Sequence, residues 1–336
     1  MDALVRRLEN KLRAGWRAMV RGIKDGNALT SIEQKIATNN LGALIDGIED
    51  AVTHFSADLA AGYVNAGQRA AREIDNAISR AFRFNVADDD AIRWMQETAR
   101  QIAQPLIEEQ QAVARRVVQL GRARGLSPRA IAHEVQASVG LTMGQVDQVH
   151  RYRTLLEAGD YRRALSYELA DGRYDQTLRR AANEGTYLGT KRIDAMVDRY
   201  RENWNRSRSD TIGLSEANNA ANAGVTEAYA QAIEQELLDE DAPIKRWVTR
   251  GDHKVRGSHR FAHGQHRKIW ESYVLGSGNR ARYPGDPRLP ARDTANCRCI
   301  SVVTIDGEVG AVPFGGPRQI VRSAPDPEER STFRLP

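Results

Sequence analysis

Residues 211–250, TIGLSEANNAANAGVTEAYAQAIEQELLDEDAPIKRWVTR, contain a sharp change in composition. The first part is rich in Ala, Glu and Gln, which favour helices, and we expect a helix over about 211–240. After Pro243 the segment IKRWVT alternates and carries β-branched and aromatic residues, so it predicts a strand. The chain therefore changes here from a helical body to a β-containing module.

The residues before this change predict further helices. An apolar stripe at spacings of three and four predicts an amphipathic helix over 1–24. We expect its apolar face to pack against the rest of the protein and its basic face to lie in solvent. Helical periodicity continues over 30–80, and the acidic cluster at 88–90 precedes a helix that runs to about Arg124. Ser127 and Pro128 begin the next helix, and Gly140 separates two short helices within 125–151. Helices are also expected over 154–170 and 173–208.

The residues after this change predict a small antiparallel sheet. HRKIW at 266–270 and CISVVTI at 299–305 are two further candidate strands, separated by a loop rich in Gly, Pro and Asp. From Pro313 onward, repeated Pro predicts an extended tail. The predicted fold is mainly α, with a long helical body, a small α+β module and this tail. The predicted divisions are 1–120, 121–242, 243–308 and 309–336.

Composition limits the class of protein. Of 336 residues, 41% are hydrophobic and 28% charged, which is typical of a soluble globular protein. The segment MDALVRRLENK has no apolar core of a secretory signal, and no apolar run approaches the roughly 20 residues of a membrane span. We therefore expect a soluble, intracellular protein with no membrane partner.

Charge is distributed unevenly along the chain. Residues 242–336 contain 17 Lys and Arg against 9 Asp and Glu, a net charge of +8, whereas residues 1–241 contain 32 against 35, a net charge of −3. A basic module suits an acidic partner such as nucleic acid, although a simple solvated basic surface gives the same pattern. The candidate residues for contact with a partner are Lys245, Arg246, Arg250, Lys254, Arg260, Arg267 and Lys268.

Two stretches resemble one protein family. In TIGLSEANNAANAG at 211–224, Ile212 and Glu216 match an Ile-Ala-Arg-Thr-Glu signature, whereas residues 213–215 depart from it. The second stretch is WVTRGDHKVRGSHRFAHGQ, followed by YPGDP and NCRC, and its matching positions are Trp247, Asp252, Arg256, His259, Gly264, Pro284, Asp286, Pro287, Asn296, Cys297, Arg298 and Cys299. In order and spacing the segments resemble the phage head morphogenesis family, the Mu F-like minor head proteins.

That resemblance implies a minor head protein attached to the portal vertex, which acts in procapsid assembly and in DNA packaging or ejection. It implies a portal protein as partner, with capsid or scaffold proteins and packaged DNA as further candidates. The basic residues named above are then the candidates for contact with the nucleic acid or the portal. The expected location is the virion, in the head interior or at the portal vertex, after assembly in the host cytoplasm. A ring-forming neck or adaptor protein is the alternative structural role, and the sequence leaves the oligomeric state open.

The chain's two cysteines suggest a metal site. Cys297 and Cys299 would project from one face of a strand, a spacing that suits two ligands of one ion better than a disulfide. His259 and His263 would share a helix face and complete a tetrahedral zinc site, with His253 and Asp252 as further candidates for the fourth ligand. Relatives carry Cys-x-x-Cys where this sequence has Arg256 and His259, so one ligand position is lost.

We therefore favour a metal-free clasp with no cofactor, formed by Trp247, Asp252, Arg256, His259, Asn296 and Arg298. In that arrangement Asp252 pairs with Arg256, His259 bonds the loop backbone, and both cysteines pack as small buried hydrophobic residues. Structural zinc is the minority hypothesis.

A metal-dependent nuclease is the less favoured enzymatic alternative, since an Asp-His pair beside a basic surface fits such a reaction. The sequence has no P-loop, no Gly-rich dinucleotide turn and no Gly-x-Ser-x-Gly elbow. The prediction is that the protein is not an enzyme.

Overall fold

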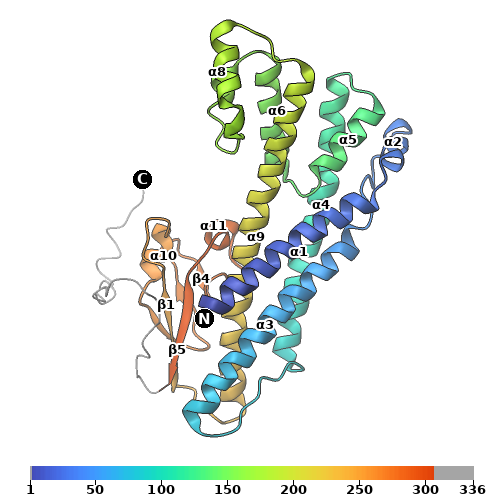
Figure 1. The fold of residues 1–336 in the computed structure, drawn as a ribbon. Coiled ribbons are helices and arrows are strands. Elements are labelled where there is room, and N and C mark those ends of the chain that lie inside the picture. The colour runs from blue at the N-terminus through green and yellow to red at the C-terminus, as the bar shows by residue number, and fades with distance from the viewer. Residues whose placement is uncertain (1, 306–336) are drawn as a thin grey trace. The chain divides into compact units, whose positions relative to one another are not determined.

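The computed structural model describes residues 2–305, and the predicted C-terminal tail lies outside these residues. The fold is mainly α with a small antiparallel sheet near the C-terminal end of the described chain, as predicted (Figure 1). The helices are α1 (Asp2–Gly26), α2 (Leu29–Ala37), α3 (Ile48–Ile78), α4 (Asp89–Ala123), α5 (Pro128–Ser138), α6 (Met143–Glu157), α7 (Tyr161–Ala164), the short 3-10 helix η1 (Gly172–Tyr174), α8 (Asp175–Glu184), α9 (Thr190–Glu234), α10 (Gly257–Ala262) and α11 (Ala291–Thr294). The strands are β1 (Pro243–Val248), β2 (His266–Lys268), β3 (Tyr273–Val274), β4 (Arg280–Ala281) and β5 (Ile300–Ile305). No helix among the described residues has the length and apolar character needed to cross a membrane.

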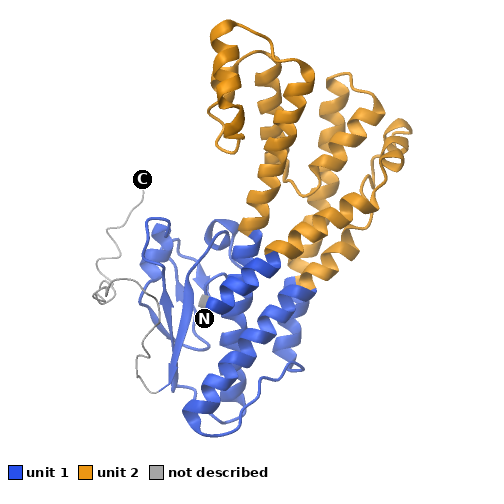
Figure 2. Ribbon diagram, in the orientation of Figure 1, with its two compact units in different colours: residues 1–12, 57–98, 212–336 blue, residues 13–56, 99–211 orange. Residues whose placement is uncertain are grey.

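The chain forms two compact units, each built from separated segments (Figure 2). Among the described residues, unit 1 contains 2–12, 57–98 and 212–305, and unit 2 contains 13–56 and 99–211. The sequence divided the chain into consecutive ranges, whereas α1, α3, α4 and α9 each contribute residues to both units. The C-terminal module therefore shares one unit with segments of all four long helices.

Local sequence signals account for several helix ends. Ser127 caps α5 by accepting a hydrogen bond from Ala130 N, and Pro128 follows it as predicted. Thr142 and Gln145 form a capping box at the start of α6. The predicted helix over 173–208 is wrong, because Gly185 takes a left-handed conformation that ends α8. Likewise α9 runs without a break through the predicted boundary at 208–211.

The core of unit 1 forms where α9 passes very close to α3. A Cβ atom at Gly224 would lie 2.2 Å from the carbonyl oxygen of Tyr63, so only glycine allows this approach. The Tyr63 ring stacks on Trp94 of α4, with centroids 4.1 Å apart. Trp94 Nε1 in turn donates to Tyr283 Oη over 2.9 Å. These contacts join three helices to the loop of the module.

A three-stranded antiparallel sheet with the order β2-β1-β5 forms the centre of the module. Val248 pairs with Ile300, and Ile244 pairs with both Thr304 of β5 and Lys268 of β2. Along β1 alternate residues are buried, so Lys245 and Trp247 face inward from the same side of the strand. Trp247 packs on Tyr273 and on both cysteines.

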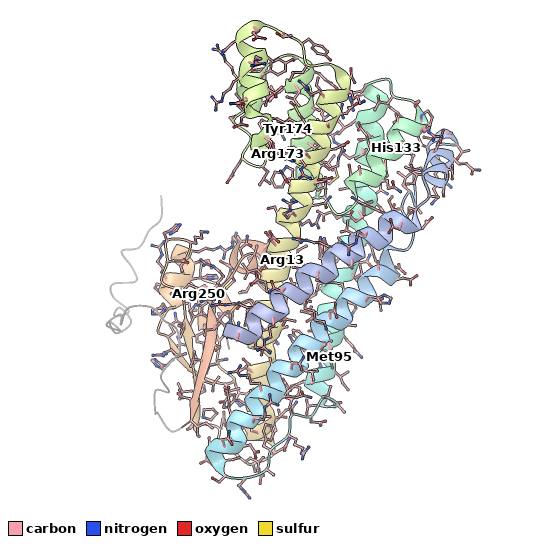
Figure 3. The ribbon with its side chains drawn as sticks, viewed as in Figure 1. Arg13, Met95, His133, Arg173, Tyr174 and Arg250 are labelled. Atoms are coloured by element: carbon pink, nitrogen blue, oxygen red, sulfur yellow. The ribbon has the colours of Figure 1, made fainter. Side chains whose placement is uncertain are left out.

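Unit 2 is entirely helical. Trp16 packs edge-on against Phe55, and Gly140 separates α5 from α6 with a φ of +89°. Asp171 holds the turn at η1 by accepting hydrogen bonds from Arg173. Figure 3 labels Arg173 and Tyr174 of this turn. The two short helices predicted around Gly140 are therefore present, and they are packed within a helical body.

Candidate metal centre

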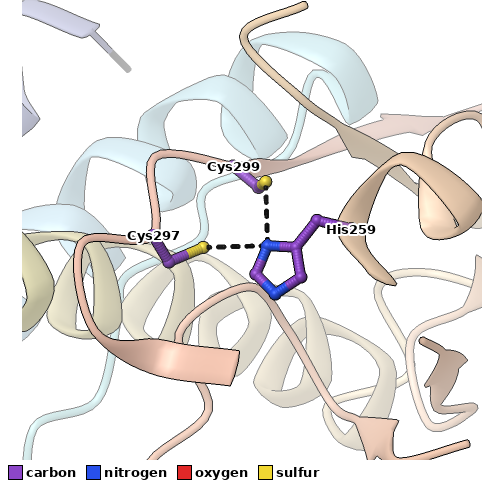
Figure 4. A group of neighbouring side chains, drawn as sticks. All are labelled: His259, Cys297 and Cys299. Carbon is purple, nitrogen blue, oxygen red and sulfur yellow. Dashed lines mark hydrogen bonds between the residues drawn. The ribbon is translucent and has the colours of Figure 1, made fainter. Parts of the chain in front are cut away.

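Three residues from two separate segments meet beside the central sheet (Figure 4). His259 lies on α10, Cys297 follows α11, and Cys299 immediately precedes β5. Asn296 lies between α11 and Cys297. It takes a left-handed conformation with a φ of +56°, which turns the chain toward β5. The only cysteines of the chain therefore face one imidazole.

The distances in this cluster suit a tetrahedral ion. His259 Nδ1 lies 3.7 Å from Cys297 Sγ and 3.5 Å from Cys299 Sγ, and all ligand atoms lie within 4.8 Å of one another. Ordinary zinc–nitrogen and zinc–sulfur bond lengths place such atoms about 3.6 Å apart at a tetrahedral angle. The relative exposures of His259, Cys297 and Cys299 are only 2%, 1% and 3%. The cluster can hold an ion that is shielded from solvent.

The pKa values of the two buried thiols shift in opposite directions. The hydrogen bond from Cys299, aided by His259, lowers the pKa of Cys297 well below its ordinary value. The same contact raises the pKa of Cys299, and burial adds to that shift. One thiolate is therefore stabilised beside one thiol, which is a donor set that favours soft metal ions.

Aromatic side chains and an unpaired ring nitrogen complete the surroundings. Trp247 meets the His259 ring edge-on at a centroid distance of 5.4 Å. Nε2 of His259 is buried and has no hydrogen-bond partner among the described residues. Only Nδ1 of this imidazole, which faces the sulfurs, therefore has polar partners.

The predicted fourth ligands lie elsewhere. His263 is exposed, and its Nδ1 accepts a hydrogen bond from Thr249 N over 3.1 Å. Asp252 accepts two hydrogen bonds from Arg298, and His253 is exposed. Within the described chain the cluster thus offers three protein ligands, which leaves a fourth position for water or another small ligand.

The residues of the predicted clasp make other contacts than the predicted ones. Asp252 pairs with Arg298, with Oδ2 to Nη1 and Oδ1 to Nη2 distances of 2.7 and 2.8 Å, so the predicted pair of Asp252 with Arg256 is wrong. Arg256 instead donates to the carbonyl oxygen of Ala295. The predicted hydrogen bond from His259 to the loop backbone is also wrong, because its ring faces the sulfurs. Asp252 therefore pairs with a residue 46 positions away and not with the arginine four positions away.

Asn222 on α9 is a central residue that sequence reasoning missed. Its side-chain nitrogen donates to Pro284 O over 3.1 Å and to Cys299 O over 3.4 Å, and its oxygen accepts from Ser301 N over 2.8 Å. The available signal was a run of Asn within an otherwise Ala-rich helix, since buried amides need partners. Asn222 ties the helix to the segment that carries both cysteines.

Asp286 anchors the YPGDP loop against the module. Its carboxylate is fully buried and accepts hydrogen bonds from the guanidinium groups of Arg282 and Arg288. Burial opposes ionisation, but these two arginines lower the pKa of Asp286 overall. Asp286, the acidic residue of the YPGDP motif, therefore holds this loop in place.

The predicted basic contact residues divide into three groups. Lys245 is buried and donates to Ile269 O and Arg282 O, so the prediction that it contacts DNA or a portal is wrong. Arg267 donates to Ser272 O and Gln265, and Lys268 pairs with Asp241. The remaining residues are half-buried or exposed, and for them contact with a partner stays a prediction: Arg246, Arg250 (labelled in Figure 3), Lys254 and Arg260.

Comparisons of this chain with protein-family models, with curated proteins and with solved structures find no match.

Proposed function

We propose that this chain is a phage minor head protein that associates with the portal and acts in head assembly and DNA packaging or ejection. The proposal is supported by the way in which the segments that resemble the head morphogenesis family pack together. Ser215 Oγ accepts a hydrogen bond from Asn296 N over 2.8 Å, and Asn222 bonds Pro284 and Cys299. Residues far apart in sequence thus contribute to one unit, as expected if the resemblance reflects a common fold.

We further propose that His259, Cys297 and Cys299 hold a structural zinc ion. The observation that carries this proposal is the pair of nitrogen–sulfur separations, 3.5 and 3.7 Å, close to those of tetrahedral zinc. When bound, the ion would cross-link α10 to the start of β5. The chain itself contributes the buried position, the stabilised thiolate and the edge-on indole of Trp247.

A fourth position left to water is the pattern of catalytic zinc, but the burial of these three ligands favours a structural role. His259 is 2% exposed, so a phosphodiester substrate cannot reach its ring. Asp252 is held by Arg298, which leaves the predicted Asp-His pair of a nuclease without its acid. We therefore propose a non-enzymatic protein. Cleavage of plasmid DNA in the presence of Mg²⁺, Mn²⁺ or Zn²⁺, abolished by His259→Ala, would contradict this.

Elemental analysis of the full chain, purified without chelator, tests the zinc proposal. We expect about one zinc per chain, and His259→Ala should remove it. His263→Ala is the matched control, since this exposed residue lies four positions away and should leave the zinc content unchanged. A wild-type content below about 0.2 zinc per chain would refute the zinc proposal alone.

Co-expression with the portal protein of the same genome tests the head-assembly role. We expect the two proteins to elute together in size-exclusion chromatography at micromolar concentrations. Asp286→Asn, which releases the YPGDP loop from its arginine partners, should weaken co-elution if the module carries the contact. Complete separation of the two wild-type proteins would count against the proposed function and would leave the zinc proposal unaffected.

A further inference from the structure

Two open pockets flank α8 at one end of unit 2 (Figures 1 and 2). The first pocket has a volume of about 450 Å³ and is lined by α8, the loop that follows it and the start of α9. The second has a volume of about 520 Å³ and is lined by α8 and the segment around α7. Both volumes fall in the range of pockets that hold small ligands or parts of larger ones.

Basic side chains dominate the charged lining of both pockets. Arg180 pairs with Glu184 over 3.9 Å, and Glu184 is the one carboxylate that lines either pocket. Five exposed basic residues line them: Arg162 and Arg179 in the second pocket, and Arg180, Lys191 and Arg192 in the first. The lining therefore has more positive than negative charge.

Other carboxylates of this segment do not compensate the excess. Asp160 and Asp171 pair with arginines outside the pockets. Glu168 and Asp175 line neither pocket. Apart from Arg180, the basic residues of the two pockets have no ion-pair partner among residues 2–305. Their positive charge is therefore uncompensated and would attract an anionic partner.

Tyr187 adds an aromatic surface to the first pocket. It lines this pocket together with Lys191 and Arg192, and it is 58% exposed. An exposed aromatic ring beside basic side chains is the arrangement that binds single-stranded nucleic acid, because a base stacks on the ring while cations hold the phosphates. An acidic peptide would use the cations alone, and a duplex keeps its bases stacked on one another. The ring therefore favours an unpaired strand.

We propose that the two pockets bind a single strand of nucleic acid. One base stacks on Tyr187, Lys191 and Arg192 hold phosphates in the first pocket, and Arg162 and Arg179 hold phosphates in the second. This surface belongs to residues 1–241, whose net charge is −3, and it is distinct from the basic residues of the C-terminal module. The proposal is independent of the head-assembly role and of the zinc site.

Fluorescence anisotropy of the full chain with a labelled oligothymidylate tests the phosphate contacts. We expect Kd to rise about tenfold or more between about 50 and 200 mM NaCl, because bound phosphates release counterions. Lys191→Gln combined with Arg192→Gln should raise Kd about tenfold, and so should Arg162→Gln combined with Arg179→Gln. Because all four residues are exposed, the Tm of these variants should equal that of the wild type.

A pair of arginines in unit 1 provides the matched control. Arg69→Gln combined with Arg93→Gln removes the same charge from exposed residues that pair with acids on their own helices. This variant should bind the strand nearly as tightly as the wild type. If it weakens binding as much as the pocket variants do, the effect comes from net charge and the proposal is wrong.

Two substitutions of Tyr187 test the stacking. Tyr187→Ala should raise Kd about tenfold, whereas Tyr187→Phe retains an aromatic ring and should bind like the wild type. The corresponding duplex and polyglutamate should bind more weakly than the single strand, since neither presents an unpaired base. A duplex that binds as tightly as the strand would overturn the proposal. Equal binding of polyglutamate would indicate an acidic protein as the partner and would overturn it too.

Ultraviolet cross-linking of the wild-type chain to a strand that contains bromouracil locates the contact without any variant. We expect the cross-link in the tryptic peptide 181–191, which contains Tyr187. Cross-links confined to peptides of the C-terminal module would place the strand elsewhere and refute the proposal.

Discussion

Nδ1 of His259 lies 3.5 Å from Sγ of Cys299, although 40 residues separate the two in sequence. The contact links α10 to the start of β5. The segment between them contains β2, β3, β4 and α11, and within it the carboxylates of Asp286 and Asp293 accept hydrogen bonds from Arg282 N, Ser277 and Asn279. The stability of the module should therefore depend on a small number of buried polar residues.

The first prediction concerns Asn222. Replacing it with Ala removes the acceptor for Ser301 N and the donor to Pro284 O, and leaves these buried backbone groups unsatisfied. We expect a loss of about 3 kcal/mol in the free energy of unfolding, measured with urea. Asn183→Ala, on the exposed surface of α8, is the control and should change stability by less than about 0.5 kcal/mol. Equal effects of the two substitutions would show that Asn222 has no special role.

The second prediction concerns Asp286 and acid. Its pKa is lower in the folded protein because Arg282 and Arg288 bind the carboxylate, so its contribution is present above the unfolded-state pKa. That contribution should be lost as the pH falls from about 4 toward the folded-state pKa. Asp286→Asn should lower stability at pH 7 by about 3 kcal/mol and flatten the acid dependence between pH 5 and pH 3, as judged by urea unfolding at each pH. An unchanged acid slope in the variant would contradict this assignment.

The third prediction concerns Lys245, whose pKa burial lowers to about 7. The unfolded chain binds more protons than the folded one between about pH 7 and pH 10, so stability should rise with pH over that range. Ile269 O and Arg282 O stabilise the ammonium form of Lys245 and so limit this rise in the free energy of unfolding, which we expect to be about 2 kcal/mol. Lys245→Met removes the titrating group. If the free energy of unfolding of this variant rises with pH as steeply as that of the wild type, Lys245 is not the cause of the rise.

The fourth prediction concerns the close approach of α3 and α9. Gly224→Ala introduces a Cβ atom 2.2 Å from Tyr63 O, and the backbone must move to accommodate it. We expect a loss of about 2 to 3 kcal/mol by thermal or urea unfolding. Gly22→Ala in α1 meets nothing within 4 Å and should be neutral or stabilising by up to about 1 kcal/mol. A neutral Gly224→Ala variant would mean that the helices separate at little cost.

Sequence patterns predicted the class of fold because their causes are local. Ser127 and Pro128 begin a helix through hydrogen bonds and φ restriction within a few residues. The alternation of IKRWVT specifies a strand in the same way. The predicted break near 208–211 failed because packing continues the helix, and the predicted helix over 173–208 failed because Gly185 can adopt a left-handed conformation.

The candidate site was predictable in part. The sequence identified Cys297, Cys299 and His259 as candidate ligands, and these three residues do meet, although neither cysteine lies in the predicted strand. His263 was an equal candidate in sequence, but it turns outward and bonds Thr249. Asn222 could not be assigned, because nothing in its neighbourhood along the chain indicates the loop that it contacts.

By itself, the sequence determined that the chain is mainly helical and that a short antiparallel sheet begins near Pro243. The tertiary structure alone decided that Lys245 faces inward and that Asp252 pairs with Arg298 rather than Arg256. Periodicity and capping depend on neighbours a few residues apart, whereas charge pairing and burial depend on the path of loops whose ends are brought together by packing elsewhere in the chain.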